Sequence, residues 1–117
     1  MDLDIFNNKI KLCIVGEGEW GQQVKHVVEL FDRFELLGSI NSSTPEDQKL
    51  SLLEEANMLY IAVPKDAQLE YVNYGIDNDK FTICEAPFLS SLQERKDLYF
   101  KIKENTPRAF LVNSAYY

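Results

Sequence analysis

The feature that most constrains this chain is a short apolar run that leads directly into a glycine motif. Residues 10–15 are mostly apolar, and residues 16–21 read Gly-Glu-Gly-Glu-Trp-Gly, which has the spacing G-x-G-x-x-G. In such a turn the first glycine permits a tight bend, the second lets backbone approach a pyrophosphate, and the third lets the helix pack close to the strand. An apolar helical face follows, formed by Val24, Val27, Val28 and Phe31. The motif therefore predicts a strand–turn–helix unit of the dinucleotide-binding type.

Apolar runs alternate with helical patterns along the rest of the chain. We expect strands at about 10–15, 34–40, 59–63, 81–84 and 109–112, and helices at about 20–31, 44–56, 66–74 and 91–102. This alternation predicts a parallel sheet with helices on both faces. The expected fold is α/β: a Rossmann-like, doubly wound, mostly parallel sheet of about five strands. With 117 residues, the chain is predicted to be a single domain over residues 1–117.

The last helix carries its own start signal. Ser91 and Glu94 have the spacing of a capping box, in which each side chain bonds the backbone N–H of the other residue. Its buried side is predicted to be formed by Leu92, Leu98, Tyr99 and Ile102.

Composition narrows the choice of partners. The net charge of −7 argues against binding to nucleic acid or to an anionic membrane surface. No signal peptide is evident, and no apolar run approaches the roughly 20 residues that span a membrane. Cys13 and Cys84 lie in strand-like runs and indicate reduced core residues of a cytoplasmic protein, although neighbouring parallel strands could bring them together. Two cysteines and one histidine give no metal-ligand spacing, so no metal site is expected.

Two further motifs give the sequence a family resemblance. An apolar strand closes in Ile61-Ala62-Val63-Pro64, and a later strand runs into Ile83-Cys84-Glu85-Ala86-Pro87. Together with the glycine motif, in which Trp20 precedes the third glycine, this order resembles the N-terminal domain of the Gfo/Idh/MocA family. These proteins are NAD(P)-dependent oxidoreductases that act mostly on sugars and cyclitols. The resemblance covers about residues 10–117.

The resemblance implies a set of cofactor-binding residues. They are Gly16, Gly18, Glu19, Trp20, Gly21, Asn41, Ser42, Val63, Pro64 and Glu85. Asn41 stands 20 residues after Gly21, where an acid normally binds the adenosine ribose, and an amide binds a hydroxyl more weakly than a carboxylate does. Glu17 and Glu19 flank the expected pyrophosphate position and weaken binding there if they point inward. We therefore expect weak NAD binding, and no arginine follows Asn41 to favour NADP.

The departures from the family concern its chemistry. The family's lysine, which helps to place and polarise the reacting group of the substrate, is replaced by Ala86. A methyl group can neither donate a proton nor stabilise an oxyanion. The family's histidine after the Ala-x-Pro turn is replaced by Gln68. A separate departure concerns the fold, since the connection between Asn41 and Leu59 is long enough for only one helix. The chain also stops where the family's second domain should begin, so no catalytic residue is assigned.

Three functions remain open on these grounds. The first is an oxidoreductase-like NAD-binding domain that does not catalyse by itself and relies on a separate subunit to complete the site. The second is a non-catalytic pseudoenzyme that binds a nucleotide or nucleotide-sugar as a sensor or scaffold. The third is a homodimeric protein-interaction module, in which Tyr116 and Tyr117 lie near the contact surface.

Overall fold

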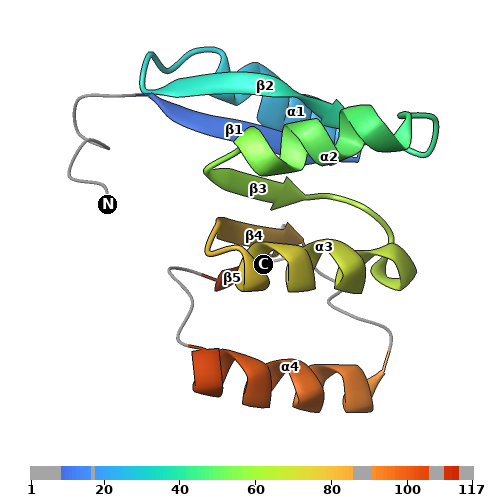
Figure 1. Cartoon of the computed structure of the whole chain (residues 1–117). Coiled ribbons are helices and arrows are strands. Elements are labelled where there is room, and N and C mark those ends of the chain that lie inside the picture. Colours follow the sequence, from blue (N-terminus) through green and yellow to red (C-terminus); the bar gives the residue numbers. More distant parts are fainter. Residues whose placement is uncertain (1–8, 17, 86–90, 106–109, 114–117) are drawn as a thin grey trace.

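Strands and helices alternate along the whole described chain (Figure 1). The computed structural model describes residues 9–16, 18–85, 91–105 and 110–113. The elements are β1 (Ile10–Val15), α1 (Glu19–Val28), β2 (Phe34–Ile40), α2 (Glu46–Glu55), β3 (Met58–Ile61), α3 (Lys65–Asp77), β4 (Phe81–Glu85), α4 (Leu92–Asn105) and β5 (Phe110–Asn113). The strands form one five-stranded sheet in the order β2-β1-β3-β4-β5. Every neighbouring pair is parallel, which confirms the predicted α/β architecture.

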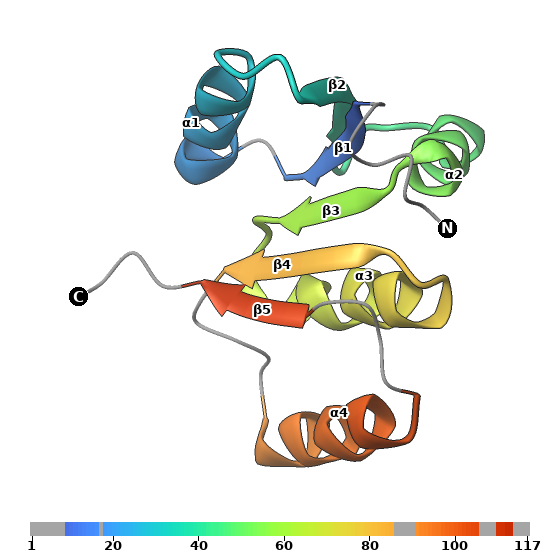
Figure 2. The same cartoon turned by 90° about the vertical axis from the view of Figure 1, so that its left-hand side faces the viewer.

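The helices cover both faces of the sheet. α1 lies on one side, and α2, α3 and α4 lie on the other (Figure 2). Successive side chains of a strand point to opposite faces. Leu12 and Ile14 therefore pack with Val28 of α1, whereas Cys13 and Val15 belong to the core that α2, α3 and α4 complete. Burial on both faces explains why β1 is apolar almost throughout.

A single helix joins β2 to β3, as the short connection predicts. Because α2 crosses back over the sheet, β1 pairs directly with β3, with Leu12 opposite Met58 and Val15 opposite Ile61. The first strand in sequence is thus the second in space, with β2 on one side and the rest of the sheet on the other. This strand order determines where a crevice forms.

Three helix ends differ from the prediction by three residues each. The helix expected over 91–102 continues to Asn105. The helix expected over 66–74 continues to Asp77, through Gly75. Gly75 is tolerated there because a Cβ at this position would overlap the Thr82 side chain of β4, so the glycine lets α3 approach the sheet. The helix expected over 20–31 instead ends at Val28, and the chain turns back toward β2 three residues earlier than predicted.

Some residues assigned to buried helix faces are exposed. Val27 and Phe31 are 53% and 55% exposed, because α1 presents mainly Val24 and Val28 to the sheet. A second group lies on α4, where Leu98 and Ile102 pack inward but Leu92 and Tyr99 face solvent. The predicted capping box is present, since Ser91 Oγ accepts from the Glu94 backbone N–H at 3.1 Å and the Ser91 backbone N–H donates to Glu94 Oε1 at 3.1 Å.

The two cysteines are separate buried thiols. Cys13 lies in β1 and Cys84 in β4, and β3 runs between them, so the alternative that neighbouring strands bring them together is wrong. Both are fully buried. Burial raises the pKa of each thiol to about 12, so both remain protonated and weakly nucleophilic at neutral pH.

The described residues contain neither a cluster of metal-binding side chains nor a helix that could span a membrane. No three His, Cys, Asp or Glu side chains gather in this part of the chain in a way that could hold a metal ion. None of its helices combines the length and the apolar character needed to cross a membrane.

Candidate functional site

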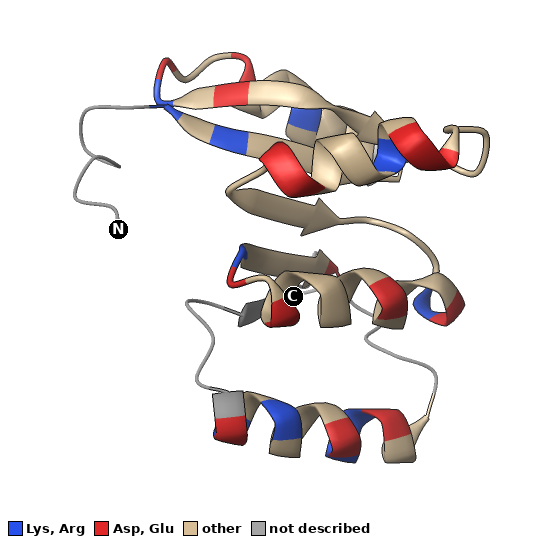
Figure 3. Cartoon of the chain, viewed as in Figure 1, with Lys and Arg blue, Asp and Glu red and all other residues tan. Residues whose placement is uncertain are grey.

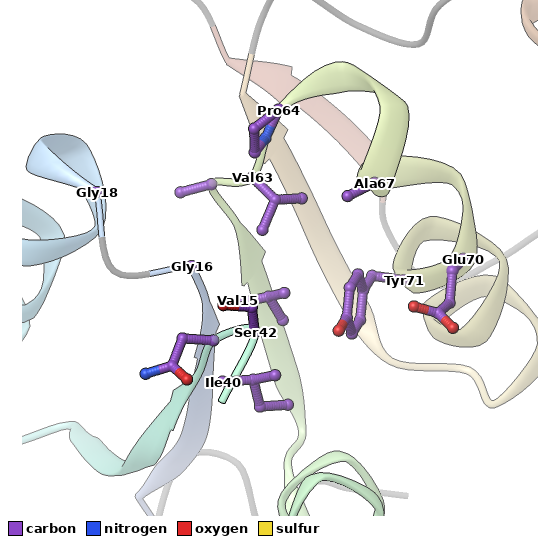
Figure 4. A pocket seen from close by; sticks show the side chains of 12 residues that line it. Val15, Gly16, Gly18, Ile40, Ser42, Val63, Pro64, Ala67, Glu70 and Tyr71 are labelled. Atoms are coloured by element: carbon purple, nitrogen blue, oxygen red, sulfur yellow. The ribbon is translucent and has the colours of Figure 1, made fainter. Parts of the chain in front are cut away.

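The strand order creates a crevice at the carboxyl ends of β1 and β3. These two strands are neighbours, but the helices that follow them, α1 and α3, cover opposite faces of the sheet (Figure 2). Ligands of open α/β sheets bind at such a switch point. A pocket of about 420 Å³ lies here (Figure 4). It is lined by Val15, Gly16, Gly18, Ile40, Asn41, Ser42, Ala62, Val63, Pro64, Ala67, Glu70 and Tyr71.

Two glycines of the motif are required by the fold itself. Gly16 has a φ of +111°, and a Cβ there would overlap the carbonyl oxygen of Ala62. A Cβ on Gly21 would lie 2.8 Å from the carbonyl oxygen of Gly16, which is too close for a real contact. Any protein with this tight strand–turn–helix geometry needs both glycines, with or without a ligand.

The middle glycine is different. Gly18 has a φ of −70° and a ψ of −177°, which any residue can adopt. A Cβ on Gly18 would find nothing within 4 Å. Gly18 is also the N-cap of α1, has no side-chain cap, and lines the pocket. The first backbone N–H groups and the positive dipole end of α1 thus lie beside the pocket, an arrangement that suits an anion.

Asn41 and Ser42 line the pocket from the end of β2. Asn41 also holds its own turn: its Oδ1 accepts from the Ser43 backbone N–H at 2.7 Å and from the Thr44 hydroxyl at 3.3 Å. The Asn41 backbone N–H donates to Thr44 Oγ1 at 2.9 Å. An aspartate at this position could serve the turn and a ribose together through two carboxylate oxygens, whereas the single amide oxygen of Asn41 is already engaged.

Val63 and Pro64 form the wall at the end of β3, and a buried glutamine fixes this wall in place. Gln68 is 1% exposed, and its Nε2 donates to the carbonyl oxygens of Val63 at 3.3 Å and of Glu85 at 3.0 Å. The side chain that replaces the family's histidine therefore ties the ends of β3 and β4 together. Both of these hydrogen bonds are to backbone carbonyl groups, on the β3 side of the crevice.

Glu85 does not line the described pocket. Its Oε2 accepts a hydrogen bond of 2.9 Å from the Tyr60 hydroxyl. Burial raises the pKa of the Glu85 carboxyl, and the Tyr60 hydrogen bond opposes part of that rise. Gly21 is not a lining residue either, since it packs beneath the turn.

Several residues of the sequence-based assignments lie outside what the structure describes. They are Glu17, the side chains of Glu19 and Trp20, Ala86, Tyr116 and Tyr117.

Three lining residues come from α3 and were not predicted. Ala67, Glu70 and Tyr71 follow one another at helical spacing and face the crevice (Figure 4). Tyr71 also packs into the core and is only 9% exposed. The signal that could have identified these residues is positional, because the first turns of α3 directly follow β3 at the switch point.

Comparisons with known proteins give matches of structure only. No protein-family model matches the sequence, and no curated protein matches it. Among solved structures, myo-inositol 2-dehydrogenase from Lactobacillus plantarum is similar at a TM-score of 0.75 and 15% identity, covering 91% of this chain and 36% of that one. The WlbA dehydrogenase from Chromobacterium violaceum, in complex with NADH and UDP-GlcNAcA, has a TM-score of 0.71 at 15% identity, with coverage of 90% and 35%.

A third similar structure is described as NADPH-dependent. It is an oxidoreductase from Desulfitobacterium hafniense, with a TM-score of 0.73 and 21% identity over 91% of this chain and 35% of that chain. At these identities the likeness establishes the fold, which is Rossmann-like as predicted. The chain spans about a third of the length of the solved structures that it matches.

Proposed function

We propose that this chain is an NAD-binding domain of the oxidoreductase type, related to sugar and cyclitol dehydrogenases, and that it does not catalyse hydride transfer by itself. The observation that carries the proposal is the open space at Gly18. Gly16 and Gly21 are explained by packing, but no described atom packs closely enough to explain a glycine at Gly18. A phosphate that approaches the backbone at the start of α1 does explain it.

The pocket offers a partner for each part of an adenosine diphosphate group. The start of α1 and the backbone at Gly18 would hold the pyrophosphate through N–H groups. Asn41 and Ser42 lie where the ribose would bind, and Val63 and Pro64 supply an apolar wall. When bound, NAD would contribute the nicotinamide that accepts a hydride. Since Asn41 lacks the charge of an aspartate, binding is expected to be weak.

NAD is favoured over NADP by the charges around the pocket. Among the described lining residues, the only charged side chain is the acidic Glu70. The nearby Lys49 is engaged by two carboxylates, Glu46 at 3.4 Å and Glu70 at 3.5 Å. A 2′-phosphate would therefore meet negative charge and no arginine.

The chemistry of hydride transfer needs groups that this sequence does not offer. Ala86 stands where the resemblance places a lysine, and an alanine cannot move the proton of a substrate hydroxyl. Turnover would also need a closed, water-poor substrate pocket. We therefore propose that a separate subunit completes any active site.

Calorimetric titration with NAD⁺, NADH, NADP⁺ and UDP-sugars tests the proposal, and a Gly18→Val variant identifies the site. The wild-type protein is expected to bind NAD⁺ or NADH. The Gly18→Val side chain fills the space at the start of α1, so binding should fall at least about tenfold, the equivalent of about 1.4 kcal/mol. Its melting temperature should stay close to that of the wild type, because a Cβ there has no described atom within 4 Å apart from those of the adjacent residues.

Three results would contradict the proposal. If no dinucleotide binds, the glycine turn serves only the fold. Binding of a UDP-sugar alone would replace NAD with the nucleotide-sugar alternative. Equal NAD affinity of Gly18→Val and wild type would place the cofactor elsewhere.

A second candidate function is a protein-interaction module. The observation that favours it is the group of large exposed apolar side chains on α1, on the turn after it and on α4, among them Leu30 at 80% and Phe100 at 58% exposure. Self-association is compatible with nucleotide binding, because these residues do not line the pocket.

A further inference from the structure

The α3 side of the pocket has a mixed chemical character that the glycine turn does not account for. Ile40, Val63 and Ala67 are apolar and suit the flat faces of a base. Glu70 and Tyr71 are adjacent on α3 and add a carboxylate and a phenol to the same side of the pocket (Figure 4). A flat ligand that enters between the end of β2 and α3 would thus meet two polar groups at its edge.

A lysine from the neighbouring helix holds these two groups in position. Lys49 is the only basic residue of α2, which also carries four acidic residues (Figure 3). Its Nζ lies 3.5 Å from Glu70 Oε1, 3.4 Å from Glu46 Oε1 and 5.1 Å from the centre of the Tyr71 ring. Lys49 therefore bridges α2 and α3 directly beside the pocket and restricts the positions that Glu70 can adopt.

The charge of this lysine is secure at neutral pH. Burial by itself would lower the pKa of the Lys49 ammonium, but Tyr71 and the two carboxylates outweigh burial and raise it. The Glu70 carboxylate therefore lies beside a cation, the Lys49 ammonium.

The two groups at the edge differ in what they can offer a ligand. An ionised carboxylate only accepts hydrogen bonds, whereas a phenol hydroxyl can also donate one. The ammonium of Lys49 has only donors, so the Tyr71 hydroxyl cannot direct its proton toward it. This edge of the pocket therefore presents Glu70, which can only accept hydrogen bonds, beside Tyr71, which can donate one.

We propose that Glu70 and Tyr71 select a base that carries an exocyclic amino group next to a ring nitrogen acceptor, namely adenine, and reject bases with an oxo group there. This inference rests on the nucleotide-binding function proposed above. Adenine offers an amino donor to Glu70 and a ring nitrogen acceptor to Tyr71. Hypoxanthine places an oxo oxygen against the carboxylate, where two acceptors repel each other, and its ring N–H replaces the acceptor that Tyr71 would bond.

The test compares NAD⁺ with nicotinamide hypoxanthine dinucleotide, which differs only at the base. Dissociation constants for both are measured by calorimetry on the wild-type protein, on Glu70→Gln and on Glu46→Gln. Glu46→Gln is the matched control, since Glu46 contacts the same lysine but does not line the pocket. The Glu70 side chain is 67% exposed, so its replacement is not expected to disturb the fold, and the melting temperature verifies this.

We expect the wild-type protein and Glu46→Gln to prefer NAD⁺ by about tenfold or more, as a charge-assisted hydrogen bond would give. In Glu70→Gln the preference should fall to about twofold or less, because a carboxamide can turn to present either a donor or an acceptor.

Three outcomes overturn the inference. Equal affinity of the wild type for both dinucleotides would overturn it while leaving the NAD-binding function in place. Loss of the preference in Glu46→Gln to the same extent as in Glu70→Gln would assign the effect to the Lys49 contacts and not to Glu70. If neither dinucleotide binds, both the inference and the proposed function are contradicted.

Discussion

At the scale of single residues, the three glycines of the motif have different physical reasons to be glycine. Gly16 needs a positive φ and lies against the backbone of Ala62, and Gly21 lies against the backbone of Gly16. Gly18 has neither constraint. Substitutions of Gly16 and Gly18 should therefore separate folding from binding within one short turn.

Gly16→Ala is expected to lower the free energy of unfolding by about 2–5 kcal/mol, combining backbone strain with overpacking against Ala62. Gly18→Ala should change it by less than about 1 kcal/mol, since alanine adopts the Gly18 conformation without strain. Urea unfolding followed by circular dichroism measures both. A Gly16→Ala protein as stable as the wild type would mean that the turn can relax away from β3.

At the scale of elements, apolar packing and one lysine side chain attach α4 to the rest of the described structure. Leu98 and Ile102 pack against the core, and Lys101 reaches α3. Its Nζ lies 2.8 Å from Asp77 Oδ1 and donates to Asn73 Oδ1 at 2.8 Å. These contacts join α4 to the helix that also lines the pocket, so α4 docking and α3 position are linked.

Lys101→Met should loosen α4 while keeping the apolar part of the side chain. The effect on global stability is expected to be below about 1 kcal/mol, because the ion pair is partly exposed to solvent. Hydrogen exchange of the α4 amides should become faster, by up to about fivefold. Lys103→Met is the matched control, since Lys103 lies exposed two residues further along the same helix. Equal exchange in both variants would show that Leu98 and Ile102 hold α4 unaided.

At the scale of the whole molecule, apolar surface remains exposed after the sheet has been covered on both sides. Val27, Leu30 and Phe31, here called the α1 patch, gather at the end of α1 and in the turn after it. Leu92, Tyr99 and Phe100 are exposed on α4, where the rings of Tyr99 and Phe100 lie edge to face at 5.5 Å. Groups of large exposed apolar side chains are typical of interaction surfaces.

We expect the chain to self-associate at high concentration through the α1 patch. Light scattering over a range of concentrations should show the mass rising from monomer to dimer. Leu30→Ser should shift this equilibrium toward the monomer at little cost in stability, because Leu30 is 80% exposed. Leu50→Ser, at a half-exposed site on α2 outside the patch, is the control. A monomer at every concentration would contradict the prediction.

The sequence by itself determined the alternation of strands and helices, the single crossover helix between β2 and β3, and the capping box at Ser91. These features depend on local spacing, since side-chain periodicity and turn residues act within a few positions of the chain. The glycine turn could be identified from the sequence for the same reason, because its residues lie within a few positions of one another. This locality also explains the errors at the ends of α1 and α3. Close packing of Gly75 against Thr82 of β4 accompanies the longer α3, and Phe31, expected on the buried face of α1, is exposed beyond its end.

Only the tertiary structure decided which face of each helix is buried and which residues share the pocket. Ala67, Glu70 and Tyr71 reach the crevice because β1 and β3 are neighbours, although about 50 residues separate the glycine turn from α3. Likewise, the amide oxygen of Asn41 accepts its hydrogen bonds from Ser43 and Thr44 only when the turn has formed. Contacts between distant segments depend on strand order and on the space left between packed side chains, and neither is encoded in the spacing of any single stretch of sequence.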